Sequence, residues 1–391
     1  MIRREEIREL AEFQTEREGE CAITFYFQPR TPQNKSHREE SILVKDLVRT
    51  ALRETQKSGK NGGARADLER ILDLATKLPG SQVQAKAVFA CGARNLWREF
   101  DLPPRLPGTQ LAVNRRFHLK PIALLLGAQP QLAVVLVDGH RARVFDLRLD
   151  ELKEREGIFR PQSRRGRGDG FGGYDAGHAE RRVQDEAMHH FKTVADRLKV
   201  EMEKGTWDKL IVGCLDSSWR EFEPHLHPNV KQRLLGHFAA EVAGMSPEAV
   251  REKADQVLQG ALERHRHDVV REALGQARSH GRGVTGLRRV LRSLELGEVQ
   301  ALLIGHNYNA HAVECTACGR IDSHMIPYCA LCGRSTRELE DVCDAIIPLA
   351  IRRDIELLYV DDAELEQVGN IAALLRFRTD RSKGEQIAAA S

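Results

Sequence analysis

Four of the eight cysteines stand in two Cys-x-x-Cys pairs, a spacing that suits metal binding. Cys315 and Cys318 form the first pair, Cys329 and Cys332 form the second, and a glycine follows each pair. Two residues between cysteines bring both sulfurs within reach of one ion, and four thiolates complete a tetrahedral shell without a vacant position. We therefore predict a structural zinc site. The alternatives are a redox-active pair or a site that no longer holds a metal.

The other cysteines show no such spacing. Cys21, Cys91 and Cys214 each lie alone in or beside an apolar, strand-like run, so we predict buried and unreactive thiols. Cys343 follows the second pair by a short distance in the sequence. Nothing in the pattern indicates an extracellular disulfide framework.

A second chemical feature is the segment from Ser163 to His178, which is rich in glycine and arginine. It has no apolar period, so it can bury no face as a helix or strand. An amphipathic helix follows, with apolar residues from Val183 to Met202 at spacings of three or four. Glycines allow the backbone to approach a crowded surface and arginines contact phosphates, which suits a probe that reaches into nucleic acid. The alternative is a flexible, solvated linker.

Known catalytic signatures are absent from the sequence. There is no Gly-x-Ser-x-Gly, His-Glu-x-x-His or phosphate-loop motif. His178, His189 and His190 lie near the glycine-rich segment and are candidates for acid–base work. Because 15 histidines are spread through the chain, we favour surface roles for these three.

Length and composition limit the class of protein. The 391 residues predict two or three domains, and the 41% hydrophobic share is enough for real cores. A net charge of +3 excludes binding by overall attraction, so contact with nucleic acid has to come from local patches. The charged N-terminus has no apolar signal region, and no apolar run approaches the length of a membrane span. We expect a cytoplasmic protein that has no membrane contact.

The elements that position these features alternate between helix and strand. The first part predicts a helix over residues 1–20, a strand at 21–27, helices around 43–52 and 64–78, and a strand at 87–91. The middle part predicts a hairpin of strands 132–137 and 142–147 about Asp138-Gly139, a strand at 209–213, helices to about 240, and a helix capped by Ser246-Pro247. The last part predicts helices at 286–294 and 340–351, strands at 299–304 and 355–360, and the cysteine insert at 315–332.

Together these elements predict an α/β protein of three mixed α/β domains, the third a small α/β sandwich that carries a zinc-ribbon insert. The prolines at 103–107 and the break at 129–131 place one boundary near residue 128. A second boundary is expected around 268–283, where the helical pattern ends at Gly281 and Gly283. The predicted parts are an N-terminal domain at 1–128, a middle domain with the glycine-rich tip at 129–275, a C-terminal domain at 276–378, and a disordered tail at 379–391.

This order of parts resembles the archaeo-eukaryotic class-one release factor and Pelota superfamily, in particular its bacterial branch. The middle domain contributes the Asp138-Gly139 hairpin, the glycine-rich tip and the long helix behind it. The C-terminal domain contributes Gly-x-Ile-x-x-Leu-Leu-Arg-Phe at 369–377. Weaker similarities in the first domain are Phe89–Gly92 to Leu102-Pro103, and Arg116–Pro121.

The resemblance implies a ligand of the ribosomal A site whose middle domain points its tip at the peptidyl-transferase centre. The third domain would contact a translational GTPase or the ribosomal stalk base, and the free protein would be a monomer. The arginines would pass ribosomal RNA phosphates in a salt-dependent, sequence-neutral contact. The residues assigned to ribosomal RNA are Arg164, Arg165, Arg167, Phe171, Gly172, Gly173, Tyr174, His178, Arg181 and Arg182.

One departure from the family bears directly on activity. The family's hydrolytic triplet is Gly-Gly-Gln, and this chain has Gly172-Gly173-Tyr174. The family's glutamine helps to place water against the peptidyl-tRNA ester, and tyrosine lacks that amide but can stack on a nucleobase. We therefore assign no catalytic residue. Stop-codon reading motifs are absent too, and Asn34-Lys35-Ser36 is only a partial match, which argues against codon-specific termination.

Three functions follow as hypotheses. The first is a non-catalytic factor that occupies the A site of idle or stalled ribosomes, in hibernation or rescue. The second is an enzyme that releases nascent chains, either by peptidyl-tRNA hydrolysis supported by the backbone N–H or by cutting the tRNA end. The third is an RNA- or protein-binding adaptor that acts through the zinc knuckle without the ribosome.

Overall fold

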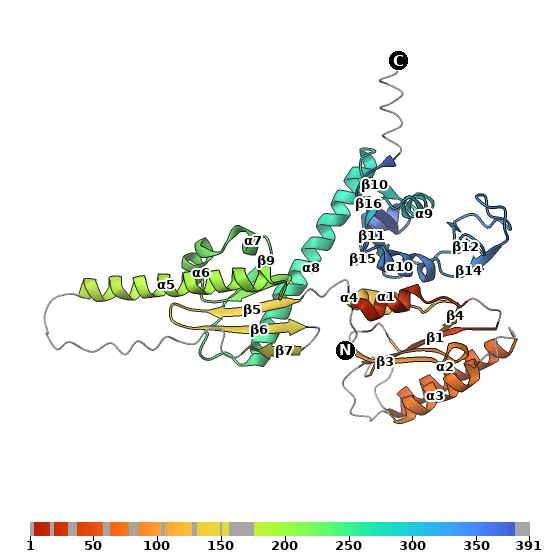
Figure 1. The fold of residues 1–391 in the computed structure, drawn as a ribbon, viewed down its shortest axis with the longest axis horizontal. Coiled ribbons are helices and arrows are strands. Elements are labelled where there is room, and N and C mark those ends of the chain that lie inside the picture. Colours follow the sequence, from red (N-terminus) through yellow and green to blue (C-terminus); the bar gives the residue numbers. More distant parts are fainter. Residues whose placement is uncertain are drawn as a thin grey trace, which may run out of the picture. The chain divides into compact units, whose positions relative to one another are not determined.

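The computed structural model describes residues 4–15, 19–29, 37–57, 63–77, 85–102, 106, 108–126, 131–148, 151–155 and 176–379. The chain forms two compact units (Figure 1), the first made of residues 1–127 and 266–391, the second of 128–265. Both units mix helices with sheets, which confirms the predicted α/β class. The division into three domains at 128 and 275 stays a prediction.

The first sheet of unit 1 is antiparallel, in the order β3-β2-β1-β4. Its strands are β1 (Ala22–Phe27), β2 (Ala85–Cys91), β3 (Leu96–Leu102) and β4 (Gln110–Asn114). The amphipathic helices α2 (His37–Lys57) and α3 (Ala64–Lys77) bury their apolar sides on one face of this sheet. These two helices confirm the predictions at 43–52 and 64–78.

The second sheet of unit 1 has the order β10-β16-β11-β15, with β11 and β15 parallel. Its strands are β10 (Gly283–Thr285), β11 (Val299–Gly305), β15 (Glu356–Val360) and β16 (Ile371–Leu375). One apolar core joins this sheet to the first through α1 (Arg4–Glu12), α4 (Lys120–Leu126), α9 (Leu287–Leu296) and α10 (Cys343–Arg352). The short helix α11 (Ala363–Gln367) lies just before β16 in the chain.

The cysteine insert forms its own small antiparallel sheet in unit 1, in the order β13-β12-β14. Its strands are β12 (Ala312–Cys315), β13 (Ile321–Asp322) and β14 (Thr336–Leu339). The insert therefore leaves the α/β core after β11 and returns to it at α10.

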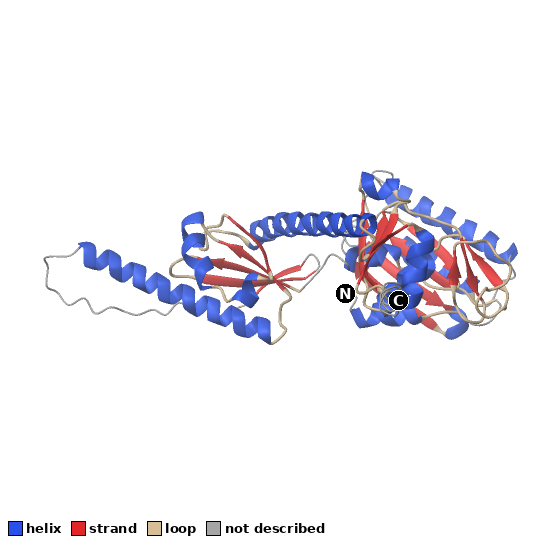
Figure 2. Cartoon of the chain, turned by 90° about the horizontal axis from the view of Figure 1, so that it is seen from above, coloured by secondary structure: helices blue, strands red, loops and turns tan. Residues whose placement is uncertain are grey.

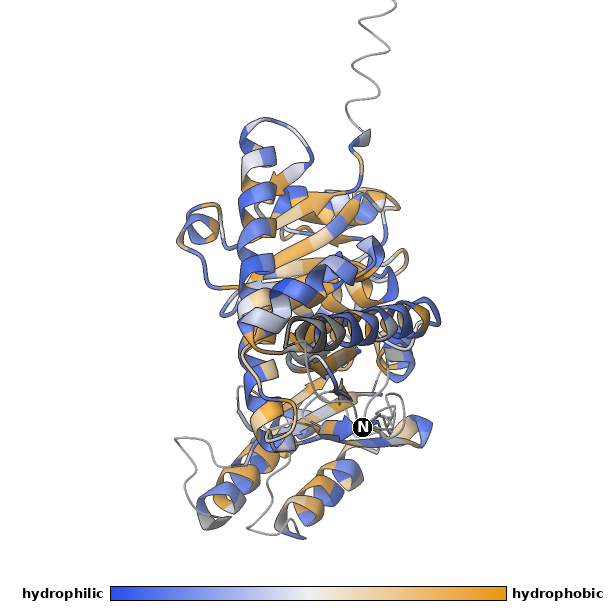
Figure 3. Ribbon diagram, turned by 90° about the vertical axis from the view of Figure 1, so that its left-hand side faces the viewer, coloured by the Kyte–Doolittle hydropathy of each residue, from blue (hydrophilic) through white to orange (hydrophobic). Residues whose placement is uncertain are grey.

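Unit 2 is a five-stranded sheet in the order β7-β6-β5-β8-β9 with helices on both faces (Figure 2). Its strands are β5 (Leu132–Val137), β6 (Ala142–Arg148), β7 (Glu151–Glu154), β8 (Lys209–Gly213) and β9 (Leu234–Phe238). The helices α5 (Ala176–Glu203), α6 (Asp216–Phe222) and α7 (Pro228–Lys231) cover one face. In Figure 3 the strands that can be seen are mainly hydrophobic, whereas the helices are hydrophobic on one side and hydrophilic on the other, as burial of one helix face against a sheet requires.

The helix α8 (Pro247–Arg278) begins in unit 2 and ends in unit 1. Val250, Ala254 and Leu258 of its first half are buried against the sheet of unit 2. Val270 and Ala273 of its second half are buried against the second sheet of unit 1. Ser246 caps the helix, since its Oγ accepts a hydrogen bond from the N–H of Ala249 at 3.3 Å, as predicted.

Some predicted elements were wrong or incomplete. Helices were expected through residue 240, but β9 occupies 234–238 because it pairs in parallel with β8. The first helix ends at Glu12 rather than near residue 20. The strands β3, β4 and β7 and the helix α4 were not predicted. No helix in the described ranges combines the length and the apolar character that crossing a membrane requires.

Candidate metal centre and tip helix

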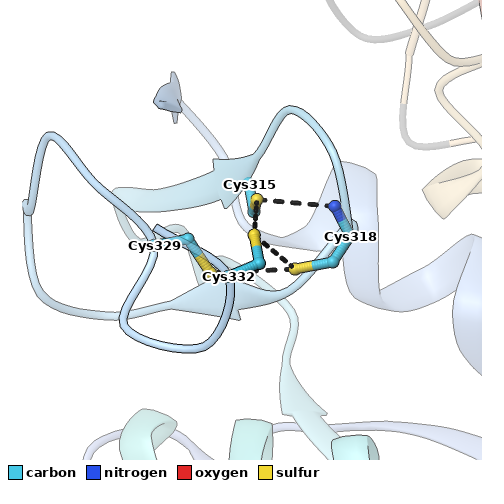
Figure 4. Close-up of side chains that lie close together, drawn as sticks. All are labelled: Cys315, Cys318, Cys329 and Cys332. Atoms are coloured by element: carbon cyan, nitrogen blue, oxygen red, sulfur yellow. Dashed lines mark hydrogen bonds between the residues drawn. The ribbon is translucent and has the colours of Figure 1, made fainter. Parts of the chain in front are cut away.

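The four predicted cysteine ligands converge at one end of the insert (Figure 4). Cys315 ends β12, and the remaining three lie in the turns that flank β13 and lead to β14. Gly319 and Gly333 follow the two pairs with φ of +69° and +70°, a backbone conformation that glycine adopts at no steric cost. Each of these glycines donates its N–H to the first cysteine carbonyl of its pair, at 3.2 Å to Cys315 and 2.9 Å to Cys329.

The sulfur positions fit one tetrahedral ion. The Sγ atoms of Cys315 and Cys332 lie 3.3 Å apart, those of Cys318 and Cys329 lie 3.7 Å apart, and those of Cys318 and Cys332 lie 3.6 Å apart. Zn–S bonds of about 2.3 Å in a tetrahedron place sulfurs roughly 3.8 Å apart. All four ligand atoms lie within 4.8 Å of one another, and the thiols are free. The four cysteines can therefore hold a zinc ion, and zinc itself stays a proposal.

Backbone N–H groups favour the thiolate form of Cys315, which is the form that binds a cation. The N–H of Cys318 donates to the Cys315 Sγ at 3.4 Å, and with a second bond from Ala317 it lowers the pKa of Cys315 to about 6. The Arg320 N–H alone would lower the pKa of Cys318, but the hydrogen bonds with the other thiols raise it to about 12. Without a cation the cluster thus keeps protons, and a bound metal would displace them.

A buried carboxylate ties the insert to the rest of unit 1. Glu314, next to Cys315, is only 2% exposed at its side chain and accepts hydrogen bonds from Arg116 and Arg337. The Nη1 of Arg116 lies 3.1 Å from Glu314 Oε2, and the Nε of Arg337 lies 3.0 Å from the same oxygen. Burial alone would raise the pKa of Glu314, but the two guanidinium groups outweigh it and hold the pKa below its usual range.

Further polar contacts join the segment at and after β4 to α10 and to the loop after β11. The Nδ1 of His118 lies 2.7 Å from Asp344 Oδ1, and Asn114 Nδ2 donates to the other oxygen of Asp344 at 2.8 Å. Lys120 donates to the carbonyl of Tyr308 at 3.0 Å. In the sequence, residues 116–121 stand out only as a family similarity, and nothing there predicts these contacts. The partners are more than 180 positions apart, as the His118–Asp344 separation of 226 illustrates, and no local pattern links them.

The predicted inert thiols are buried, as expected. Burial raises the pKa of Cys91, and it raises the pKa of Cys214 to about 12. Cys343 at the start of α10 is also buried, and burial raises the pKa of its thiol well above the usual range. None of these sulfurs belongs to the metal cluster.

The glycine- and arginine-rich tip lies mostly outside the described residues. Arg164, Arg165, Arg167 and residues 171–174 are among those that the structure does not describe. His178, Arg181 and Arg182 lie in the first turns of α5, whose backbone is described from residue 176. The predicted amphipathic helix is therefore confirmed, and it begins earlier than Val183.

The helix α5 packs against the sheet of unit 2 through its later turns. Its buried side chains run from Ala187 through Phe191, Val194 and Leu198 to Met202, the predicted apolar positions, against the sheet of unit 2. The preceding residues 184–186 are exposed, and in Figure 1 the N-terminal part of α5 extends past the strands. His189 is exposed, and His190 has a buried Nε2 without a hydrogen-bond partner in the described chain.

Comparison with known proteins gives one match to a family model, that of "Bacterial archaeo-eukaryotic release factor family 10", over residues 118–259. Among curated proteins, peptide chain release factor subunit 1 of Pyrococcus abyssi is 25% identical over 310 residues, which cover 68% of this chain and 70% of that protein. The same protein from Thermococcus onnurineus is 25% identical over 240 residues, or 53% and 57% of the two chains.

The solved structures that match this chain do so at low sequence identity. An archaeal translation termination factor, aRF1, is 19% identical, with 96% of this chain and 99% of that chain covered and a TM-score of 0.24. A structure described as ribosome-bound archaeal Pelota and ABCE1 is 14% identical, with 75% and 78% covered and a TM-score of 0.39.

Proposed function

Because the chain belongs to the archaeo-eukaryotic release factor and Pelota superfamily, we propose that it is a ribosome-binding translation factor of the cytoplasm. It occupies the A site of idle or stalled ribosomes, with its tip towards the peptidyl-transferase centre, in hibernation or rescue. It does so without hydrolysing peptidyl-tRNA.

The observation that carries this proposal is the tripeptide Gly172-Gly173-Tyr174 inside the segment that matches the family model. The two glycines keep the backbone freedom of the Gly-Gly-Gln loop, while the side-chain amide that would place water is gone. A tyrosine ring offers a flat surface for stacking on an unpaired base. The tip therefore keeps what binding requires and loses what hydrolysis requires.

The helix α5 supports the proposal as a rigid mount for the tip. Its 28 residues span roughly 42 Å at 1.5 Å per residue. The N-terminal end of a helix carries a partial positive charge, which favours phosphates, and His178, Arg181 and Arg182 lie in its first turns. Arg164, Arg165 and Arg167 come just before this end in the sequence. Positive charge is therefore concentrated there, although the net charge of the whole chain is only +3.

The family resemblance also suggests partners for the C-terminal part of the chain. Residues 276–378 contact a translational GTPase or the ribosomal stalk base, and the cysteine cluster in that segment holds zinc as a structural ion. With all four ligand positions taken by sulfur, the zinc has no place for a reacting water, so its role is to hold the insert in shape.

Co-sedimentation with ribosomes tests the proposal. The full chain is expected to pellet with 70S particles at moderate salt, and a variant lacking residues 164–178 is expected to lose most of that binding. A variant of equal length in which the same residues are replaced by a glycine-serine linker separates loop chemistry from loop length. Absence of the full chain from the pellet contradicts the proposal, as does equally tight binding to free tRNA.

The preserved glycine pair favours one alternative, release of the nascent chain supported by the backbone alone. Incubation with ribosomes that carry labelled peptidyl-tRNA distinguishes the two functions. We expect no release by the natural chain and expect Tyr174→Gln to gain it. Release by the natural chain that survives Tyr174→Ala but not deletion of residues 164–178 would establish the enzyme instead.

A further inference from the structure

A pocket of about 490 Å³ in unit 1 lies beside the cysteine cluster and takes no part in the function proposed above. Its walls come from segments of the chain that are remote in sequence. The insert supplies Glu314, Leu331 and residues 318–321, and α9 supplies Leu291, Leu294 and Glu295. The end of α10 supplies Leu349, Arg352 and Arg353, and the N-terminal part of unit 1 supplies Gln14 and Arg116. A pocket of this size falls in the range that small-molecule ligands occupy.

Four arginines line the pocket: Arg116, Arg320, Arg352 and Arg353. Two lining carboxylates oppose them. Glu314 is already bound by Arg116 and Arg337, and Glu295 lies 3.5 Å from the Nε of Arg320. Within the described part of the chain, no ion pair is formed by Arg352 or Arg353. Positive charge is therefore left over at the α10 side of the pocket.

Arg353 donates from its Nη1 to the backbone carbonyl of Leu294, a neutral acceptor, so that bond brings it no counter-charge. Two details concern the neighbouring arginines. The Nε of Arg320 is buried and makes no hydrogen bond within the described chain, although buried N–H donors are nearly always paired. Burial, Arg116 and Arg353 together lower the pKa of Arg352, against the opposing effect of Glu12 and Glu314. An anion in the pocket would supply acceptors for both groups.

The other walls are apolar. Leu291 and Leu294 are buried side chains of α9, and Ile321, Leu331 and Leu349 complete the surface. A free inorganic ion would leave this apolar area in contact with water. A ligand that pairs an anionic group with a flat, weakly polar group would cover the arginines and the leucines together.

We propose that this pocket binds a nucleotide, with its phosphate on Arg352, Arg353 and Arg320 and its base against the leucines. Guanidinium groups form paired hydrogen bonds with phosphate oxygens, which explains arginine rather than lysine at these positions. The nucleotide is either free in solution or the end of an RNA strand, and both present the same phosphate and base.

Fluorescence titration of the full-length protein with MANT-ADP and MANT-GDP, without ribosomes, tests this site. We expect saturable binding of at least one probe and a loss of affinity of tenfold or more in Arg352→Ala. Arg292→Ala removes an exposed arginine from α9 outside the pocket and is expected to leave binding unchanged. Arg352 is partly enclosed by the pocket but exposed as a whole residue, so its replacement is expected to leave the melting temperature unchanged, which is measured alongside.

Competition identifies the source of the nucleotide. Displacement of the probe by unlabelled ADP or GDP but not by a 5′-phosphorylated RNA trinucleotide indicates a free nucleotide, and the reverse indicates an RNA end. Adenosine, which lacks phosphate, is expected to compete at least tenfold more weakly than ADP. Absence of saturable binding of both probes overturns the proposal, and so does equal affinity in Arg352→Ala. Neither result affects the ribosome assay, which probes another part of the chain.

Discussion

Glu314 and Cys315 are neighbours on β12, yet they serve two different networks. The carboxylate of Glu314 accepts hydrogen bonds from Arg116, in the loop after β4, and from Arg337 on β14. The sulfur of Cys315 lies in the cluster with the three other cysteines. Both groups carry charge more readily than an isolated side chain would, because donors surround them. A single strand end thus connects the metal cluster to the core of unit 1.

The metal cluster gives the first prediction at this scale. Purified protein is expected to contain about one zinc per chain, and Cys318→Ser is expected to lose it, together with hydrogen-exchange protection of β12 and β14. Atomic emission measures the metal, and Cys21→Ala serves as a control outside the cluster. A zinc content that does not differ between the two variants would refute the assignment.

Zinc affinity is also expected to depend on pH. Thiolates bind the metal and thiols do not, so each proton that must leave makes binding weaker as pH falls, about tenfold per unit for each proton displaced. With the pKa of Cys315 at about 6 and that of Cys318 at about 12, at least one proton is displaced at neutral pH. A chelator competition between pH 6 and 8 measures this slope, and a flat profile would contradict the four-thiolate site.

Glu314 gives the third prediction. Glu314→Gln leaves the guanidinium groups of Arg116 and Arg337 without their buried counter-charge, so it is expected to destabilise unit 1 by about 3 kcal/mol. Glu338→Gln, at an exposed site on β14, is expected to have almost no effect. Urea unfolding followed at Trp97, which lies on β3 of unit 1, reports the difference.

The contribution of Glu314 to stability is expected to depend on pH, because folding lowers the pKa of its side chain. The pKa of Glu314 is held below its usual value, so its stabilising effect is present above the unfolded value of about 4.3. It is lost as pH falls through the lower, folded value. The stability gap between the natural chain and Glu314→Gln should therefore be full at pH 7 and shrink below pH 4; a gap that grows on acidification would exclude this cause.

At the scale of elements, local sequence determined many features and tertiary pairing determined the rest. The Asp138-Gly139 turn predicts the β5–β6 hairpin, whose register runs from Leu132↔Leu147 to Val137↔Ala142. The strand β9 could not be predicted, because Leu234–Phe238 is short and becomes a strand only by pairing with β8. The Arg116–Glu314 contact joins residues 198 positions apart, which no local pattern encodes.

The tip and α5 give the prediction at this scale. Replacing Arg164, Arg165 and Arg167 together by alanine is expected to weaken ribosome binding and to lower the salt slope of the binding constant by about two, since each phosphate contact on single-stranded RNA contributes about 0.7. Replacing three exposed cations of unit 2 elsewhere, Arg220, Lys231 and Lys253, removes the same charge and is expected to change the slope far less. Equal slopes in the two triple variants would contradict a role for the tip.

At the scale of the whole molecule, the chain combines two units that share the helix α8 but have separate cores. Unit 2 carries the tip, and unit 1 carries the cysteine insert and the arginine pocket. The superfamily match falls mainly on the tip-bearing unit, at residues 118–259. The functional assignment therefore depends most on where the tip goes.

A cryo-EM map of the protein bound to ribosomes of its own source organism is the most direct measurement of that position. The account predicts density for residues 164–178 in the peptidyl-transferase centre, with Tyr174 near ribosomal RNA and the peptidyl-tRNA ester, where present, intact. Particles without bound protein, or a tip folded back on its own unit and away from the centre, would contradict it.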